Sequence, residues 1–139
     1  MLIYSIEIRI RYADTDQMQF VYNGKYLEYF EVGRTEMLRE IGLPYNILEK
    51  EGYQFPVLEA HVKYHQPAFY DEVLIIKSIL KEYPALKIHI DYEILRKEAN
   101  VLIAEGFTIH AFIKKENKKI TRPPGIFINS IKKFFSSNV

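Results

Sequence analysis

One long segment with helical periodicity, residues 24–41, stands near the start of a chain whose other segments mostly alternate like strands. Tyr26, Phe30, Gly33, Met37 and Ile41 recur at spacings of three and four, which places them on one face of a helix. A single long helix must bury that apolar face against another element, and strands are the elements available. The chain is therefore constrained to a fold in which a sheet covers one central helix.

The ends of this helix carry residues typical of helix boundaries. Asn23 is predicted to be the N-cap, because its short polar side chain can accept a hydrogen bond from the first turn. Gly42 and Pro44 predict the end of the helix. A shorter helix is predicted over residues 45–51 and ends at Gly52.

The strands are predicted from period-two alternation of apolar and polar residues. The first covers residues 2–12, with the even-numbered residues from Leu2 to Tyr12 on one face. Later strands are predicted over 55–66, 72–82, 86–97 and 101–114, with a short piece near 119–122 and a short C-terminal helix after Pro123. The turns between them are supplied by Pro67 and Asp71, by Tyr83 and Pro84, and by residues 98–100.

The predicted helix and strands have matching lengths. A helix of about 18 residues extends about 27 Å, and a strand of about nine residues extends about 30 Å. A curved antiparallel sheet could therefore wrap the helix, and Gly33 in mid-helix would offer it a bare backbone face. We thus predict an α+β fold. One domain is expected over residues 1–139, because no linker or repeat interrupts the sequence.

Composition and charge limit the classes of function. Hydrophobic residues make up 48% of the 139 positions, which predicts a packed core. The formal net charge is only +1, so the excess of positive charge typical of nucleic-acid binding is missing. There are no cysteines, which excludes disulfides and a cysteine nucleophile. The sequence shows neither a signal peptide nor a membrane-spanning segment, and we expect a cytoplasmic protein.

The segment Asp14-Thr15-Asp16 precedes the expected start of the helix at Asn23 or Gly24. The first turn of a helix has unpaired N–H groups and a partial positive charge, which can hold the oxyanion that develops during acyl transfer. A nearby carboxylate can act as general base or as nucleophile on the carbonyl carbon. This combination suits hydrolysis of an activated acyl compound, although Asp and Thr also serve structural roles in loops.

Other catalytic patterns are absent from the sequence. A calcium-binding loop that began at Asp14 would need glycine at its sixth position and glutamate at its twelfth, which are Gln19 and Lys25 here. Neither the nucleophile elbow of serine hydrolases nor a phosphate-binding glycine loop is present. No metal site is therefore predicted.

The four histidines favour structural roles over catalysis. His61 and His65 would lie about 13 Å apart on one strand face, too far to share a metal ion. His89 and His110 alternate with apolar residues in their strands, so we expect them to face water or a subunit interface.

Several short stretches match a known family in order and spacing. From residue 11 the chain reads Arg-Tyr-Ala-Asp-Thr-Asp-Gln-Met, followed by Val21-Tyr22, Tyr26-Leu27, Phe30-Glu31 and Arg34-Thr35-Glu36. Further on come Gly42-Leu43-Pro44-Tyr45, Phe55-Pro56-Val57 and Gln66-Pro67-Ala68. Over residues 6–125 the sequence resembles the hotdog-fold acyl-CoA thioesterases. It is most similar to the 4-hydroxybenzoyl-CoA thioesterase family, which includes a Tol–Pal-associated bacterial branch.

The resemblance implies a fold and a site. A five- or six-stranded antiparallel sheet would wrap the long helix. Asp16, the second acid of the family's Asp-x-Asp motif, would be the catalytic carboxylate, and backbone N–H groups at Asn23 and Gly24 would hold the thioester oxygen. The resemblance also implies a homo-oligomer, a dimer paired through edge strands or a tetramer. Coenzyme A would enter only as part of the substrate, with no metal or other cofactor.

Further residues around this site have expected roles. Met18, Phe20 and Tyr22 are predicted to line the acyl pocket, and Glu31 with Arg34 could form an ion pair on the helix. The chain also departs from the family at three positions. Gln19 stands where glycine is usual, Asn23 where many relatives have histidine, and Phe69 where arginine is frequent.

The predicted function is hydrolysis of an acyl-CoA thioester to a free acid and coenzyme A. One alternative is a hotdog dehydratase or hydratase, which would need a catalytic histidine near the central helix, and residues 1–60 contain none. The other alternative is a non-catalytic module that binds acyl-CoA or an acyl carrier, which Gln19 and Asn23 would favour.

Overall fold

The computed structural model describes residues 1–135. Its helices and strands are, in order, β1 (Leu2–Arg9), the 3-10 turn η1 (Tyr12–Asp14), α1 (Lys25–Glu40), α2 (Tyr45–Lys50), β2 (Tyr53–Gln54), β3 (Val57–Tyr64), β4 (Val73–Leu80), β5 (Ile88–Arg96), β6 (Val101–His110), β7 (Phe112–Lys114), β8 (Ile120–Thr121), α3 (Gly125–Ile131) and the 3-10 turn η2 (Lys132–Phe134). None of the helices in this range is long and apolar enough to cross a membrane.

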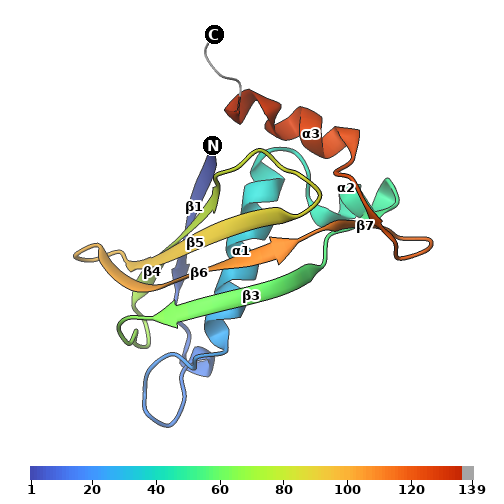
Figure 1. The fold of residues 1–139 in the computed structure, drawn as a ribbon. Coiled ribbons are helices and arrows are strands. Elements are labelled where there is room, and N and C mark those ends of the chain that lie inside the picture. The colour runs from blue at the N-terminus through green and yellow to red at the C-terminus, as the bar shows by residue number, and fades with distance from the viewer. Residues whose placement is uncertain (136–139) are drawn as a thin grey trace.

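Five strands form one antiparallel sheet in the order β1-β4-β5-β6-β3. Figure 1 shows α1 lying across one face of this sheet, with α3 near the chain's N-terminus. The short strands β2, β7 and β8 form a second, small sheet. The predicted α+β fold with a sheet around one long helix is confirmed. Strand β3 ends the large sheet, and all its residues except Val62 are exposed.

The helix and the sheet approach each other closely at two glycines. A Cβ atom on Gly33 of α1 would come within 2.6 Å of Ser78 Oγ and 2.8 Å of Ile76 Cγ2, both in β4. A Cβ atom on Gly106 of β6 would come within 2.9 Å of the ring of Phe30 in α1. The predicted packing role of Gly33 is confirmed, because the bare backbone of the helix comes close to Ile76 and Ser78 of β4 at this position.

Some boundaries differ from the sequence predictions. Strand β1 ends at Arg9, and Tyr12 lies in η1 with 78% of its surface exposed, because the chain has already turned away from the sheet. The strand predicted over 101–114 is two strands, β6 and β7, separated at Ala111. Strand β2 was not predicted, because two residues are too few to show an alternation.

A line of buried hydrogen bonds joins β5 to β6 and ends at His110. The hydroxyl of Tyr92 lies 2.6 Å from Thr108 Oγ1, which lies 2.9 Å from His110 Nε2. His110 Nδ1 lies 3.4 Å from the carbonyl oxygen of Phe55, which can only accept, so Nδ1 carries the proton. His110 is fully buried, and the expectation that it faces water or an interface is wrong. Its ring stacks on Phe55 instead, with centroids 4.3 Å apart.

Burial, together with the positive charge of Arg34, lowers the pKa of His110 from 6.5 to about 4. An unfolded chain therefore takes up a proton below about pH 6.5, while the folded chain resists it until about pH 4. Stability should fall across this window by up to about 1.4 kcal/mol per pH unit. Denaturant unfolding at several pH values should show that His110→Gln removes this slope, whereas the same change at exposed His89 does not. An unchanged slope in the His110 variant would contradict this assignment.

The contact at Gly33 predicts that Gly33→Ala lowers stability, although alanine is the better helix former by about 1 kcal/mol. The new methyl group overlaps Ser78 Oγ and Ile76, and such overpacking costs about 1–3 kcal/mol. Adding Ser78→Ala should recover part of the loss. Gly125→Ala in α3 is the matched control, because nothing lies within 4 Å of a Cβ atom there. Urea midpoints of the four chains test the prediction, and a stabilised Gly33→Ala chain would refute it.

Candidate functional site

A tight hairpin between Thr15 and Val21, which pair as an isolated bridge, carries the predicted catalytic residue. The N–H of Asp16 donates to the carbonyl oxygen of Phe20 at 3.1 Å, and the N–H of Gln19 donates to the carbonyl oxygen of Asp16 at 2.9 Å. This is the pattern of a three-residue hairpin loop whose last residue has left-handed backbone. The loop geometry fixes the direction in which the Asp16 side chain leaves the chain.

Gln19 occupies the left-handed position, with φ of 69°. A Cβ atom costs about 1–2 kcal/mol in this region, whereas glycine adopts it freely. The resemblance leads us to expect glycine here for this reason. Gln19 adopts the same left-handed backbone conformation. Having glutamine in place of glycine therefore adds backbone strain but leaves the hairpin in place.

The first acid of the motif, Asp14, braces the loop. It is 3% exposed, and its Oδ2 accepts hydrogen bonds from the N–H of Arg11 at 3.0 Å and from the hydroxyl of Tyr29 at 3.1 Å. Its Oδ1 lies 3.3 Å from the Arg11 guanidinium and 3.6 Å from Lys25 Nζ. Burial raises the pKa of this carboxyl, but the hydrogen bonds and the two cations outweigh burial and hold the pKa below its usual range. Asp14 therefore ties the loop to the first turns of α1.

Asp16, by contrast, has no cationic partner in the described chain. Its Oδ1 accepts the N–H of Met18 at 2.9 Å, which fixes the side chain in a local turn. Its Oδ2 makes no hydrogen bond or ion pair within residues 1–135. A fixed carboxylate with one uncommitted oxygen can take a proton from water or attack a carbonyl carbon.

A cavity of about 340 Å³ lies beside Asp16. Its walls come from the hairpin, from the start of α1 and from the end of β3: Asp16, Met18, Phe20, Val21, Asn23, Tyr26, Tyr64, His65, Gln66 and Pro67. The structure thus brings Met18, Phe20 and Asn23 together with Asp16. Tyr22 is not part of this wall; it is 54% exposed, and its ring covers Gly24.

The start of α1 differs from the prediction. Gly24, which has helical backbone, is the N-cap, and no side chain caps the helix, so the prediction for Asn23 is wrong. The turn begins one residue earlier, because the N–H of Lys25 already donates to the carbonyl oxygen of Tyr22 at 2.9 Å. The N–H groups of Asn23 and Gly24 donate to no acceptor within residues 1–135. Two donors at the positive end of α1 are therefore available to a ligand.

Two tyrosines of the cavity were not predicted as site residues. Tyr26 is 3% exposed, its ring meets that of Tyr64 edge-on at 5.4 Å, and burial raises the pKa of its phenol to about 12. Tyr64 donates its hydroxyl to the carbonyl oxygen of Asn23 at 3.1 Å. Helical periodicity assigned Tyr26 only to the core, and no local pattern could join Tyr64 to a residue 41 positions away.

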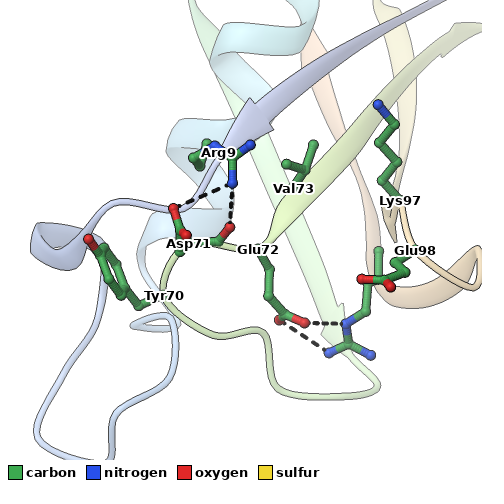
Figure 2. A pocket seen from close by; sticks show the side chains of 8 residues that line it. Arg9, Tyr70, Asp71, Glu72, Val73, Lys97 and Glu98 are labelled. Carbon is green, nitrogen blue, oxygen red and sulfur yellow. Dashed lines mark hydrogen bonds and ion pairs between the residues drawn. The ribbon is translucent and has the colours of Figure 1, made fainter.

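A larger cavity of about 600 Å³ lies on another part of the surface, and its ion pairs support the site. Figure 2 shows Glu72 among the side chains that line this cavity. Glu72 Oε2 accepts a hydrogen bond from Arg96 Nε at 2.8 Å. Glu72 Oε1 also accepts the N–H of Phe69 at 2.7 Å, and Arg96 donates to the carbonyl oxygen of Pro67 at 2.8 Å. This pair therefore holds the turn at Pro67–Phe69. The turn contacts the hairpin of residues 15–21 through the bridge between Phe20 and Phe69.

Comparison with known proteins decides the family. The profile of the Thioesterase-like superfamily matches residues 10–134. The chain belongs to the thioesterase-like superfamily. The candidate acyl-CoA thioesterase YneP of Bacillus subtilis is 34% identical over 81% of this chain and 81% of its own length. The acyl-CoA thioesterase YbgC of Haemophilus influenzae is 30% identical over 76% of each chain.

A solved structure confirms the fold of this thioesterase-like chain. The DHNA-CoA thioesterase of Staphylococcus aureus superposes with a TM-score of 0.89 at 30% identity, covering 97% of this chain and 92% of that one. The predicted hotdog fold and the predicted family are confirmed. Within residues 1–135, no three His, Asp or Glu side chains gather as a group that could hold a metal ion.

The left-handed backbone at Gln19 predicts an unusual response to glycine. Gln19→Gly should keep stability or raise it by up to about 1 kcal/mol, because relief of strain offsets the greater freedom of the unfolded chain. Gln17→Gly is the matched control, since Gln17 is exposed, lies in the same turn and has no positive φ; it should lose up to about 1 kcal/mol. Chemical denaturation compares the two. Equal losses in both variants would count against the strain at Gln19.

Proposed function

We propose that this chain hydrolyses acyl-CoA thioesters, with the carboxylate of Asp16 as its reactive group. One observation carries the proposal. The uncommitted oxygen of Asp16 and the unpaired N–H groups at the start of α1 occur together at one cavity, with Asp16 and Asn23 both in its wall. That is the pairing of base and oxyanion donors that acyl transfer requires.

The proposed reaction begins with the thioester carbonyl oxygen held by the N–H groups of Asn23 and Gly24. The carboxylate of Asp16 either takes a proton from a water molecule that attacks the carbonyl carbon, or attacks that carbon itself to give an anhydride that water then opens. In both routes the carbon–sulfur bond breaks and the thiolate leaves and is protonated. The products are a free acid and coenzyme A. In a single-turnover reaction in ¹⁸O-labelled water, label in Asp16 identifies direct attack, because only an anhydride that water opens at the Asp16 carbonyl places label there.

The substrate pocket and its surroundings follow from the same cavity. Met18 and Phe20 provide apolar wall for the acyl group. Tyr22 lies outside this wall, with its ring over Gly24 at the start of α1. Coenzyme A takes part as a portion of the substrate, and no cofactor is invoked. The exposed edge of β3 borders the cavity at Tyr64, so we also propose a homodimer, which could pair further into a tetramer. A cytoplasmic location remains our prediction.

The decisive variant is Asp16→Asn, which keeps the size of the side chain and removes its charge. We expect kcat for a panel of acyl-CoAs of graded length to fall about a hundredfold or more, which is typical of losing one group that stabilises the transition state. Thiol release gives the rate, and thermal melting verifies the fold. Asp71→Asn is the matched control, because Asp71 is an exposed aspartate outside the cavity.

Two outcomes would overturn the proposal. Near-normal turnover by Asp16→Asn would remove Asp16 from the reaction. Binding of acyl-CoA by the wild-type chain without release of thiol, across the whole panel, would favour a binding module instead.

A further inference from the structure

Arg34 in α1 is a buried cation that lacks an acidic partner in the part of the chain that the structure describes. It is 8% exposed, and no carboxylate of residues 1–135 lies within 4.0 Å of its guanidinium. Its Nε donates to the hydroxyl of Tyr45 at 3.3 Å, and the hydroxyl of Tyr92 is a second hydrogen-bonding neighbour; both hydroxyls are neutral. Burying a charge without a counter-charge is costly, so a partner from outside this subunit is expected.

Glu31, one turn earlier in α1, is the complementary case. It is exposed and forms no ion pair with another group of residues 1–135, so the predicted ion pair between Glu31 and Arg34 within the helix is wrong. The reason is that Arg34 turns inward to Tyr45. Both side chains nevertheless line one cavity of about 340 Å³, which lies between α1, α2 and the start of β3. Two opposite charges thus share a cavity, and neither is neutralised by the other.

The position of these charges along α1 suits a two-fold axis. The helix covers residues 25–40, so its midpoint falls between Val32 and Gly33, and Glu31 and Arg34 are equally far from it. If a second copy packs with its α1 antiparallel about this midpoint, Glu31 of each copy meets Arg34 of the other. The two-fold symmetry then produces two equivalent ion pairs, so that Glu31 and Arg34 of both subunits are neutralised.

The same axis suits the exposed strand β3, Val57–Tyr64. Phe30 of α1 packs against Gly106 of β6, which is opposite Val62 of β3, so the middle of the helix crosses near the middle of this strand. Leu27 of α1 is 43% exposed and lies on the same helix face as Glu31. An axis through the helix midpoint therefore also passes near the centre of β3, where two free strand edges can pair antiparallel.

We propose that two copies of this chain recognise each other through reciprocal ion pairs between Glu31 and Arg34. In that arrangement β3 pairs antiparallel with its copy, and the partner's Val57 lies beside Tyr64 of this subunit. Val57 belongs to the wall of the Arg34 cavity, and Tyr64 belongs to the wall of the Asp16 cavity. Each catalytic cavity is then completed by the Arg34 cavity of the partner subunit.

A small anion is the competing occupant for Arg34. The cavity walls favour the protein carboxylate, because Glu31 and Glu49 both line this cavity and would repel a free phosphate or carboxylate. The partner's Glu31 also carries a negative charge into the cavity. In that case, however, Glu31 of this subunit forms an ion pair with an arginine of the partner, which offsets the repulsion.

Charge exchange tests the proposal. In the Glu31→Lys chain both reciprocal contacts become pairs of cations, and in the Arg34→Glu chain both become pairs of anions. Each variant should therefore dimerise at least about tenfold more weakly than wild type. Mixed together, the two chains regain one contact between opposite charges, since the unchanged Arg34 of the first chain faces the unchanged Glu31 of the second. The two introduced side chains have opposite charges and form the other contact. Heterodimers should therefore form in at least about tenfold preference over either homodimer.

Native mass spectrometry with one mass-tagged chain measures this preference. Glu28→Lys is the matched control, because Glu28 pairs with Lys25 inside its own subunit at 3.3 Å. This variant changes the charge of the same helix by the same amount, and its dimers should be as tight as those of the wild type.

Several results would overturn the proposal. These are a wild-type chain that stays monomeric at high concentration, a mixture without heterodimer preference, and Glu31→Lys dimers as tight as wild type. Glu31→Gln is a second variant that should not disturb folding, since Glu31 is exposed; it should weaken dimers while thermal melting of the monomer is unchanged. Inorganic phosphate that binds the wild-type chain and is lost only on changing Arg34 would assign the cavity to a small anion instead.

The proposal rests on the homodimer inferred above and not on the assignment of Asp16. Its measurement is assembly, and the Asp16→Asn chain should assemble like wild type. Failure of hydrolysis and failure of recognition are therefore seen in separate experiments.

Discussion

The close seating of α1 on the sheet is the constraint on which the rest of the structure depends. Gly33 on the helix and Gly106 on the sheet are two points where a Cβ atom would come within 3.0 Å of a side chain of the other element. They set the height and the lateral position of the helix, and with them the place where its first turn emerges beside the hairpin of residues 15–21. The candidate site has no separate scaffold, since it forms where this helix begins.

The two acids of the Asp-Thr-Asp motif show how neighbours assign different roles to identical side chains. Asp14 is surrounded by donors and cations, which stabilise its charge and commit both of its oxygens. Asp16 sits two residues later, beyond the reach of Arg11 and Lys25, and retains one oxygen without a partner in the described chain. The difference between the two carboxylates arises from the path of the loop, because the turn around Gln19 places the second carboxylate in the wall of the cavity.

The sequence was sufficient for the parts of the structure that rest on local periodicity. The long helix, the main strands and the packing role of Gly33 follow from spacing, because burial repeats every two or about 3.6 residues along the chain. It was less informative where partners are distant. The inward turn of Arg34 toward Tyr45, the burial of His110 and the meeting of Tyr64 with Asn23 depend on which distant segments of the chain become neighbours. The cap at Asn23 failed for a more local reason, since the turn had already begun at Tyr22.

Tyr64 links two parts of the molecule whose roles are otherwise separate. Its backbone belongs to the outermost strand, while its hydroxyl holds the carbonyl oxygen of Asn23 and its ring packs on Tyr26. Whatever covers or frees that strand must also tighten or loosen the first turn of α1. Because the proposed dimer pairs through this strand, turnover per subunit should depend on protein concentration, and dilution alone would change catalytic efficiency without altering a single residue of the cavity.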